Sequence, residues 1–381
     1  MEQRRFPGNS HWYHETQTSL PAQRSALVPE AADITDRFLL GLAQQAEGEI
    51  KTLVQRAQPL HLASRDLYQL LFPGQLSTSL THTLTLYDRI STALTVAQVT
   101  GIQRLCNHYA ARLNPLPGPD SSRESNRRLT QITEYARQLA GQPTLIDSAA
   151  LHRLDEVGLT APDIITFSQI IGFVSYQARV VAGLHALMAL PVRWMPGVSV
   201  PPDATALPAG VWQPALAPLE PRYAAADQLE ALTFCLPLLQ PESAVWLLAR
   251  DGDVLNGWGY LLSALKKQHA SDDTALAAAV TARINGSSLC FGYYPPGELH
   301  DALRENVDRA LSIASERQKA IILLACQLTR APERVSAAHV QPMREAGLTT
   351  AEIFDVILNV AVASWSNRLM QSLGTVSLEN H

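Results

Sequence analysis

The residues of this chain best suited to chemistry are its four cysteines, because a thiolate is both a nucleophile and a metal ligand. They are Cys106, Cys235, Cys290 and Cys326, and no two of them form a C-x-x-C pair. This wide spacing argues against a disulfide scaffold or a zinc ribbon and suits a reducing cytosol. We accordingly expect no metal site and no other cofactor.

One segment, residues 281–294, carries the strongest functional signal. It reads Thr-Ala-Arg-Ile-Asn-Gly-Ser-Ser-Leu-Cys-Phe-Gly-Tyr-Tyr. It resembles the active-site segment of the AhpD-like family, which includes carboxymuconolactone decarboxylases and alkylhydroperoxidases. In that family a helix runs into Asn-Gly-Cys-x-x-Cys-x-x-x-His. The Gly-Leu-Thr-x-x-Glu-Ile motif at 347–353 and the Ser-Asn-Arg-Leu run at 366–369 are similar to that family as well.

The resemblance implies a degenerate active site in the second half of the chain. The family's first cysteine falls at Ser287, the second at Cys290 and the histidine at Tyr294, while its helix glutamate falls at Ala275. In a dithiol peroxidase one thiolate attacks the O–O bond and the other resolves the sulfenic acid. With a single thiol here, turnover would need an external thiol to reduce a Cys290 sulfenic acid.

A weaker counterpart of this segment lies in the first half. Residues 105–109 align with 289–293 at an offset of 184, which places Cys106 at the second cysteine position and Gln103 at the first. His108 would then lie beside the thiol, where it either raises the thiolate character of Cys106 or simply faces solvent. Free cysteines are, however, ordinarily small apolar core residues, and that structural interpretation stands beside the catalytic one.

Three further residues are candidates for substrate binding. His339 lies where a second family-like motif would place its histidine, although a structural hydrogen bond is the favoured interpretation. Arg179 and Arg368 occupy largely apolar segments, where an unpaired charge is very costly. We predict that both arginines are buried and donate hydrogen bonds to helix-end carbonyls or to a carboxylate, with anion binding as the alternative.

The chain contains a long internal repeat. Residues 126–184 and 315–373 align without a gap at a constant offset of 189. Roughly a quarter of the positions are identical, and the matches include Gly, Pro, Thr and Arg, which low-complexity helices would not match by chance. Each copy predicts a helix that ends at a proline, a short helix that stops at Gly158 or Gly347, and a long apolar helix capped by Thr160 or Thr349.

This pattern predicts an all-α protein made of two tandem AhpD-like helical bundles, packed as a pseudo-dimer about a pseudo-twofold axis. Residues 1–30 are expected to form an irregular tail and residues 31–190 the first helical domain. A proline-rich linker spans 191–223, and the second helical domain spans 224–381. The eight prolines between 191 and 221 exclude a helix there and favour an extended segment.

Composition limits the partners. The apolar fraction is 46% against 17% charged, and the net charge of −5 with no basic run makes nucleic acid an unsuitable partner. No apolar run reaches the roughly 20 residues of a membrane span, and the N-terminal stretch lacks the apolar core of a signal peptide. We expect a cytoplasmic protein that acts on a small-molecule substrate or an external thiol reductant, and the resemblance implies a homo-oligomer.

Three functions remain open from the sequence alone. The first is a peroxidase-like oxidoreductase with a single-cysteine site, which requires thiolate character at Cys290 or Cys106. The second is a non-catalytic AhpD-like scaffold that binds a small ligand or a protein, which requires inert thiols. The third is a cofactor-free lyase or decarboxylase, which requires a polar pocket built around His and Arg. Likeness at the level of the fold does not choose among them.

Overall fold

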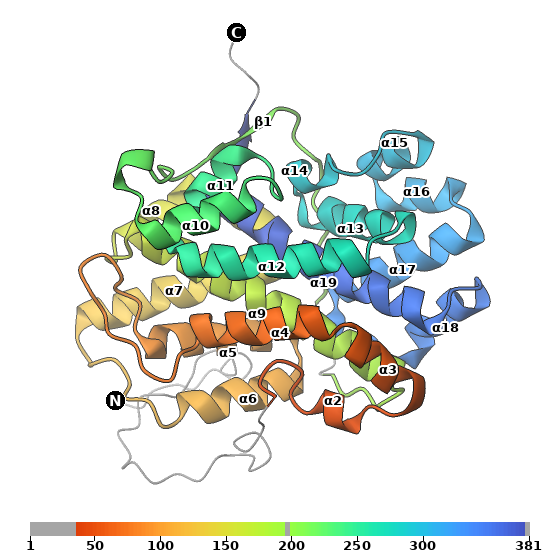
Figure 1. Cartoon of the computed structure of the whole chain (residues 1–381), viewed down its shortest axis with the longest axis horizontal. Coiled ribbons are helices and arrows are strands. Elements are labelled where there is room, and N and C mark those ends of the chain that lie inside the picture. The colour runs from red at the N-terminus through yellow and green to blue at the C-terminus, as the bar shows by residue number, and fades with distance from the viewer. Residues whose placement is uncertain (1–35, 195–198, 378–381) are drawn as a thin grey trace, which may run out of the picture.

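Over the residues that it describes, the computed structural model is all-α, as the sequence predicts, apart from one two-stranded ribbon. The structure describes residues 36–194 and 199–377 (Figure 1). The predicted N-terminal tail, residues 1–30, lies outside the described residues. The whole of the first repeat copy, 126–184, is described and contains no strand.

The first half supplies the helices of residues 42–187. Their bounds are α2 (Leu42–Gln45), α3 (Gly48–Arg56), α4 (Gln58–Leu71), α5 (Leu86–Thr100), α6 (Gln103–Leu113), α7 (Arg123–Gly141), α8 (Ser148–Asp155) and α9 (Ala161–Leu187).

The second half supplies the remaining helices. Their bounds are α10 (Ala226–Cys235), α11 (Glu242–Leu248), α12 (Gly252–Gln268), α13 (Asp272–Asn285), α14 (Ser288–Phe291), α15 (Glu298–Glu305), α16 (Val307–Ile313), α17 (Glu316–Arg330), α18 (Ala337–Glu345) and α19 (Thr350–Leu373). Strand β1 (Val211–Pro214) pairs antiparallel with β2 (Gly374–Ser377), so part of the predicted linker joins the end of α19.

Helices α9 and α19 form the core and pack against each other through the middle of the molecule (Figure 1). Among the described helices, α9 alone is long and apolar enough to cross a membrane, but 94% of its most apolar window is buried inside the protein. A helix that is apolar on all sides and covered by other helices is the core helix of a globular protein. The first and second halves therefore share one core.

Small residues allow the two core helices to approach closely. A Cβ added at Gly172 would lie 2.0 Å from the Trp365 ring, and one at Gly183 would lie 2.2 Å from the Ile357 side chain. The Trp365 ring also stacks on Tyr176 with 5.7 Å between ring centroids. Only glycine leaves room for such a contact, so these positions fix how tightly the halves pack.

The elements of the two repeat copies begin and end at matched positions. Helices α7 and α17 end 189 residues apart, and the same spacing separates the starts of α8 and α18 and of α9 and α19. Thr160 and Thr349 each form a capping box, with Asp163 and Glu352 respectively. Tandem duplication stays a prediction, and these matches support it.

Candidate functional site

Cys290 lies just after the sharp break between α13 and α14. Gly286 follows the last residue of α13 with a φ of +78°, a conformation that favours glycine. A Cβ at this position would also lie 2.6 Å from the Thr144 methyl group, so two constraints select glycine here. Ser287 then precedes α14, and Cys290 is the third residue of that one-turn helix.

Two polar side chains lie beside the Cys290 thiol, and a third bonds to one of them. Ser287, which is 1% exposed, and Asn367, which is fully buried, lie close enough to lower the pKa of the thiol. Burial has the larger effect, so the pKa of Cys290 is raised above its ordinary value. Asn285 donates from Nδ2 to Asn367 Oδ1 at 3.1 Å. We call Asn285, Ser287, Cys290 and Asn367 the Cys290 centre.

The Cys290 centre holds polar atoms that its thiol satisfies only weakly. The Ser287 hydroxyl and the Asn367 amide nitrogen are both buried and make no hydrogen bond to an oxygen or nitrogen of a described residue, and the neighbouring Cys290 sulfur is a weak acceptor. A buried donor that loses water and gains no acceptor costs about 1–3 kcal/mol. Such atoms are therefore candidates for contact with a bound ligand or water.

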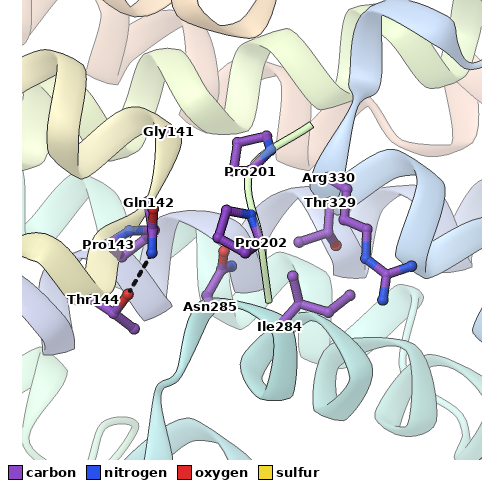
Figure 2. Close-up of a pocket in the computed structure, with 10 residues that line it drawn as sticks. All are labelled: Gly141, Gln142, Pro143, Thr144, Pro201, Pro202, Ile284, Asn285, Thr329 and Arg330. Atoms are coloured by element: carbon purple, nitrogen blue, oxygen red, sulfur yellow. Dashed lines mark hydrogen bonds between the residues drawn. The ribbon is translucent and has the colours of Figure 1, made fainter. Parts of the chain in front are cut away.

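A small cleft opens beside Asn285 (Figure 2). Its lining comes from both halves and from the linker: Gly141, Gln142, Pro143, Thr144, Pro201, Pro202, Ile284, Asn285, Thr329 and Arg330. About 20 Å³ is open to the centres of water-sized molecules, which is enough for about one or two waters. No larger ligand fits this cleft in its present form.

Tyr294 does not contribute its side chain to the Cys290 centre in the way that the resemblance implies. Its ring stacks on His300 with 6.2 Å between centroids, and His300 also packs on Phe291 at 4.9 Å. Burial and the nearby Asp272 carboxylate raise the pKa of Tyr294, so its hydroxyl remains protonated at neutral pH. The structure therefore brings Ser287 and Cys290 together and directs Tyr294 toward a histidine that the sequence interpretation overlooked.

The predicted counterpart in the first half differs in two ways. Burial raises the pKa of Cys106 to about 12, and burial with the nearby Arg112 and Arg37 lowers the pKa of His108 to about 3. A neutral imidazole does not stabilise a thiolate. Instead, His108 Nε2 and the Tyr68 hydroxyl form a 2.7 Å hydrogen bond, and the residue is only 2% exposed, so neither thiol activation nor a solvent-facing ring fits its surroundings.

The predicted alignment of Cys106 with Cys290 is also shifted by one residue in the structure. Gly101 (φ +70°) ends α5 as Gly286 ends α13, so the helix ends match at an offset of 185 rather than 184. In the first half, the carbonyl of the residue after the glycine, Ile102, accepts from the Cys106 amide. In the second half, the corresponding carbonyl of Ser287 accepts from the Phe291 amide. Cys106 thus occupies a different turn position from Cys290, and Gln103 does not match Ser287.

The other two cysteines are core residues. Cys235 is fully buried and Cys326 is 4% exposed. Burial raises the pKa of Cys235 to about 11 and that of Cys326 to about 12. Both behave as small apolar side chains, as buried free cysteines generally do.

The two predicted arginines are buried, and they make matching contacts across the halves. Arg179 donates from Nη2 to the Thr329 carbonyl at 2.7 Å, and Arg368 donates from Nη2 to the Ala140 carbonyl at 2.6 Å. Both acceptors lie in the last turn of a helix, where carbonyls lack a helical donor. Thr329 and Ala140 are themselves 189 residues apart, so each half caps a helix of the other. The prediction of buried, carbonyl-bound arginines is confirmed.

His339 has the structural role favoured from its sequence. Its Nδ1 lies 3.2 Å from the Ser336 amide and 3.1 Å from the Ser336 hydroxyl, and it completes the capping box of α18. His339 Nδ1 accepts from the Ser336 amide, an arrangement that favours the neutral imidazole. Burial lowers the pKa of His339. No observed contact connects His339 with the Cys290 centre.

One polar cluster was missed by the sequence interpretation. The His269 ring, 1% exposed, makes a 2.7 Å hydrogen bond through Nδ1 to Asp355, which also accepts from Arg56. Burial lowers the pKa of His61 to about 4, with a smaller contribution from the nearby His269. These residues come from α3, α4, α19 and the end of α12, so no local spacing indicated them. Within the described residues no three His, Cys, Asp or Glu side chains gather as metal ligands.

Comparison with known proteins identifies no family for this chain. No protein-family model matches it, and no curated protein matches it. The AhpD-like resemblance therefore stays a prediction.

Proposed function

We propose that this chain is a non-catalytic AhpD-like helical scaffold that binds a small ligand at the Cys290 centre. The observation that carries the proposal is the enclosed setting of the thiols, since Cys235 and Cys326 are buried and Cys106 and Cys290 are partly buried. Burial raises the pKa of every one of the four cysteines, Cys106, Cys235, Cys290 and Cys326. Reactive cysteines need the opposite shift, because the thiolate is the attacking species.

The size of the effect favours binding over redox catalysis. An ordinary thiol with a pKa near 8.5 is about 3% ionised at pH 7, whereas catalytic cysteines have pKa values of roughly 3.5–7.5. At the pKa of about 12 given to Cys106, the thiolate fraction at pH 7 falls to about 10⁻⁵. Cys290 is shifted in the same direction, and the side chains beside it are amides and a hydroxyl rather than a base. Nothing described at this centre takes a proton from the thiol.

The Cys290 centre nevertheless has features of a binding site. The Ser287 hydroxyl and the Asn367 amide, which the thiol satisfies only weakly, provide hydrogen-bond donors in a water-poor setting, where each bond to a ligand is strengthened. The adjoining cleft is lined by both halves and the linker. A small ligand with oxygen acceptors suits such donors.

A one-cysteine peroxidase is the second candidate, favoured by the closeness of Ser287 and Asn367 to the thiol. In that reaction the Cys290 thiolate attacks a hydroperoxide, the O–O bond breaks, and the products are a sulfenic acid and an alcohol. An external thiol then releases water and forms a mixed disulfide, and a second external thiol restores Cys290. The lyase hypothesis has less support, because the cleft lining includes Arg330 but no histidine.

Sulfenic acid trapping separates the first two functions. The folded protein is treated with hydrogen peroxide and a sulfenic-acid trap, and the modified cysteines are mapped by mass spectrometry, with Cys290→Ser as the matched control. A binding scaffold predicts modification of Cys290 no faster than that of the core residue Cys235. Selective and rapid labelling of Cys290 favours the peroxidase instead.

A further inference from the structure

A short piece of the linker lies across the cleft beside the Cys290 centre. Residues 201–204, Pro-Pro-Asp-Ala, have no regular structure, and we call them the strap. Figure 2 shows Pro201 and Pro202 running between the turn at Gln142 and Thr144 on one side and Thr329 and Arg330 on the other. The strap thus forms one wall of the cleft and limits its size.

Four hydrogen bonds hold the strap down. The Ala204 amide donates to the Ile284 carbonyl at 2.9 Å, and Arg283 Nη1 donates to the Ala204 carbonyl at 2.6 Å. Arg330 donates two hydrogen bonds to the Asp203 carboxylate, from Nε at 2.7 Å and from Nη2 at 2.5 Å. Ala204 is only 6% exposed as a result, although it belongs to an irregular segment.

The strap contacts the edge of the Cys290 centre. A Cβ at Gly286 would lie 2.9 Å from the Ala204 Cβ, so the strap touches the backbone between Asn285 and Ser287. The centre includes two donors that have the weakly accepting Cys290 sulfur beside them, the Ser287 hydroxyl and the Asn367 amide, each on a side chain at least nine-tenths buried. Two buried donors that are poorly satisfied, in a centre that the strap contacts, point to a ligand that the present form excludes.

Arg330 connects the strap with the chemistry of that ligand. It lines the cleft together with Asn285, and it already holds a carboxylate, that of Asp203, in a two-bond pairing. This geometry is the strongest that an arginine offers to a carboxylate. Both side chains remain about one-third exposed, so water and solutes reach the pair. A carboxylate from outside can compete for the same guanidinium.

We infer that the cleft is a binding site for a small carboxylate, closed in this form by the strap, whose Asp203 occupies Arg330 as an internal substitute. A ligand carboxylate displaces Asp203, the strap lifts, and Ser287 and Asn367 donate to the ligand's oxygen atoms. The inference rests on the proposed function only in assigning binding to the Cys290 centre.

The strap is tested with a reporter thiol placed beneath it. Ser287→Cys is combined with Cys290→Ser, and the alkylation rate of residue 287 by iodoacetamide is followed by mass spectrometry. Adding Asp203→Asn should raise the rate at least about ten-fold, because the population with an open strap rises. The matched control is Glu220→Gln, which breaks the exposed linker ion pair with Arg222 and should leave the rate within about two-fold.

The ligand class is tested on the same reporter with sodium acetate as the probe. Acetate should raise the alkylation rate in the protein that retains Asp203, whereas acetamide and sodium chloride at equal concentration should not. Acceleration by chloride as well as acetate would show simple screening of the ion pair and would overturn the carboxylate assignment.

A second measurement does not depend on the reporter variant folding. Hydrogen exchange of the Ala204 amide, in the chain with all its cysteines, should accelerate on Asp203→Asn and remain unchanged on Glu220→Gln. Equal exchange in all three proteins would remove the strap inference but leave the proposed function standing. Rapid peroxide oxidation of Cys290 would remove the proposed function but leave the strap inference standing.

Discussion

Replacing Arg368 with Met tests whether the two halves are held together by reciprocal capping. The guanidinium is 1% exposed and donates to the Ser364 carbonyl at 2.9 Å and to the Ala140 carbonyl at 2.6 Å. Ala140 is in the last turn of α7, so its carbonyl has no helical donor to replace the arginine. Leaving it unpaired costs about 1–3 kcal/mol, and the bonds to a charged donor contribute about 1.5–3 kcal/mol each.

An opposing effect reduces this loss. Methionine removes a buried cation whose desolvation is unfavourable, and replacing buried charges by apolar residues is sometimes stabilising. Burial, together with the nearby Arg179, holds the pKa of Arg368 well below its ordinary value. With both contributions included, we expect a net loss on the order of 3 kcal/mol for Arg368→Met and a similar loss for Arg179→Met.

Urea unfolding followed by circular dichroism measures the loss. The control is Arg137→Met on the same α7 helix, because Arg137 is half exposed and forms a surface ion pair with Glu134. That variant should unfold within about 0.5 kcal/mol of the parent. Transitions of the Arg368 and Arg179 variants that overlay the parent would refute the capping argument.

The double variant, with both arginines replaced by methionine, tests whether the two losses of stability add. Because the two cations repel each other, removing either one also removes this repulsion, which makes each single loss of stability smaller. In the double variant the repulsion is removed only once. The double variant should therefore lose more than the sum of the single losses, by about 0.5 kcal/mol or more.

Three further predictions follow from the same structure. Ser287→Cys should form an intramolecular disulfide with Cys290 under mild oxidation, detectable as a 2 Da loss of mass, provided that the Cα atoms lie within roughly 7 Å. Gly172→Ala should cost about 1–3 kcal/mol in urea unfolding because its Cβ meets a ring at 2.0 Å, whereas Gly118→Ala, with open space around it, should cost less than about 0.5 kcal/mol. Burial lowers the pKa of His61 to about 4, so the unfolded chain binds a proton near pH 6.5 that the folded state does not bind. The free energy of unfolding should therefore fall as the pH is lowered, by up to about 1.4 kcal/mol per pH unit between pH 6.5 and 4. His61→Gln should flatten this part of the stability profile.

The sequence predicted the features that local rules control. Thr160 and Thr349 cap their helices, and Gly158 and Gly347 end the preceding turns with the same φ of +85°, because capping depends on residues a few positions apart. The buried arginines were also predictable, since a charge inside an apolar helix must find acceptors.

Features that depend on tertiary packing were not predictable. The sequence placed His108 beside a thiol, but the fold turns the ring toward Tyr68, which is 40 residues away. The pairing of His269 with Asp355 joins groups 86 residues apart, and nothing in either neighbourhood indicates it. The strap was predicted only as an extended proline-rich linker, because its Arg330 contact crosses 127 residues.

The pH dependence of Cys290 alkylation tests the central claim most directly. Folded protein is exposed to iodoacetamide between pH 6 and 10, the modified peptide is quantified by mass spectrometry, and the urea-unfolded chain provides the reference for an ordinary thiol. Because burial raises the pKa of this thiol, the folded rate should remain below the unfolded rate and should still be rising at pH 9. A folded rate that exceeds the reference and levels off below about pH 7.5 would reveal an activated thiolate and would contradict the binding-scaffold account.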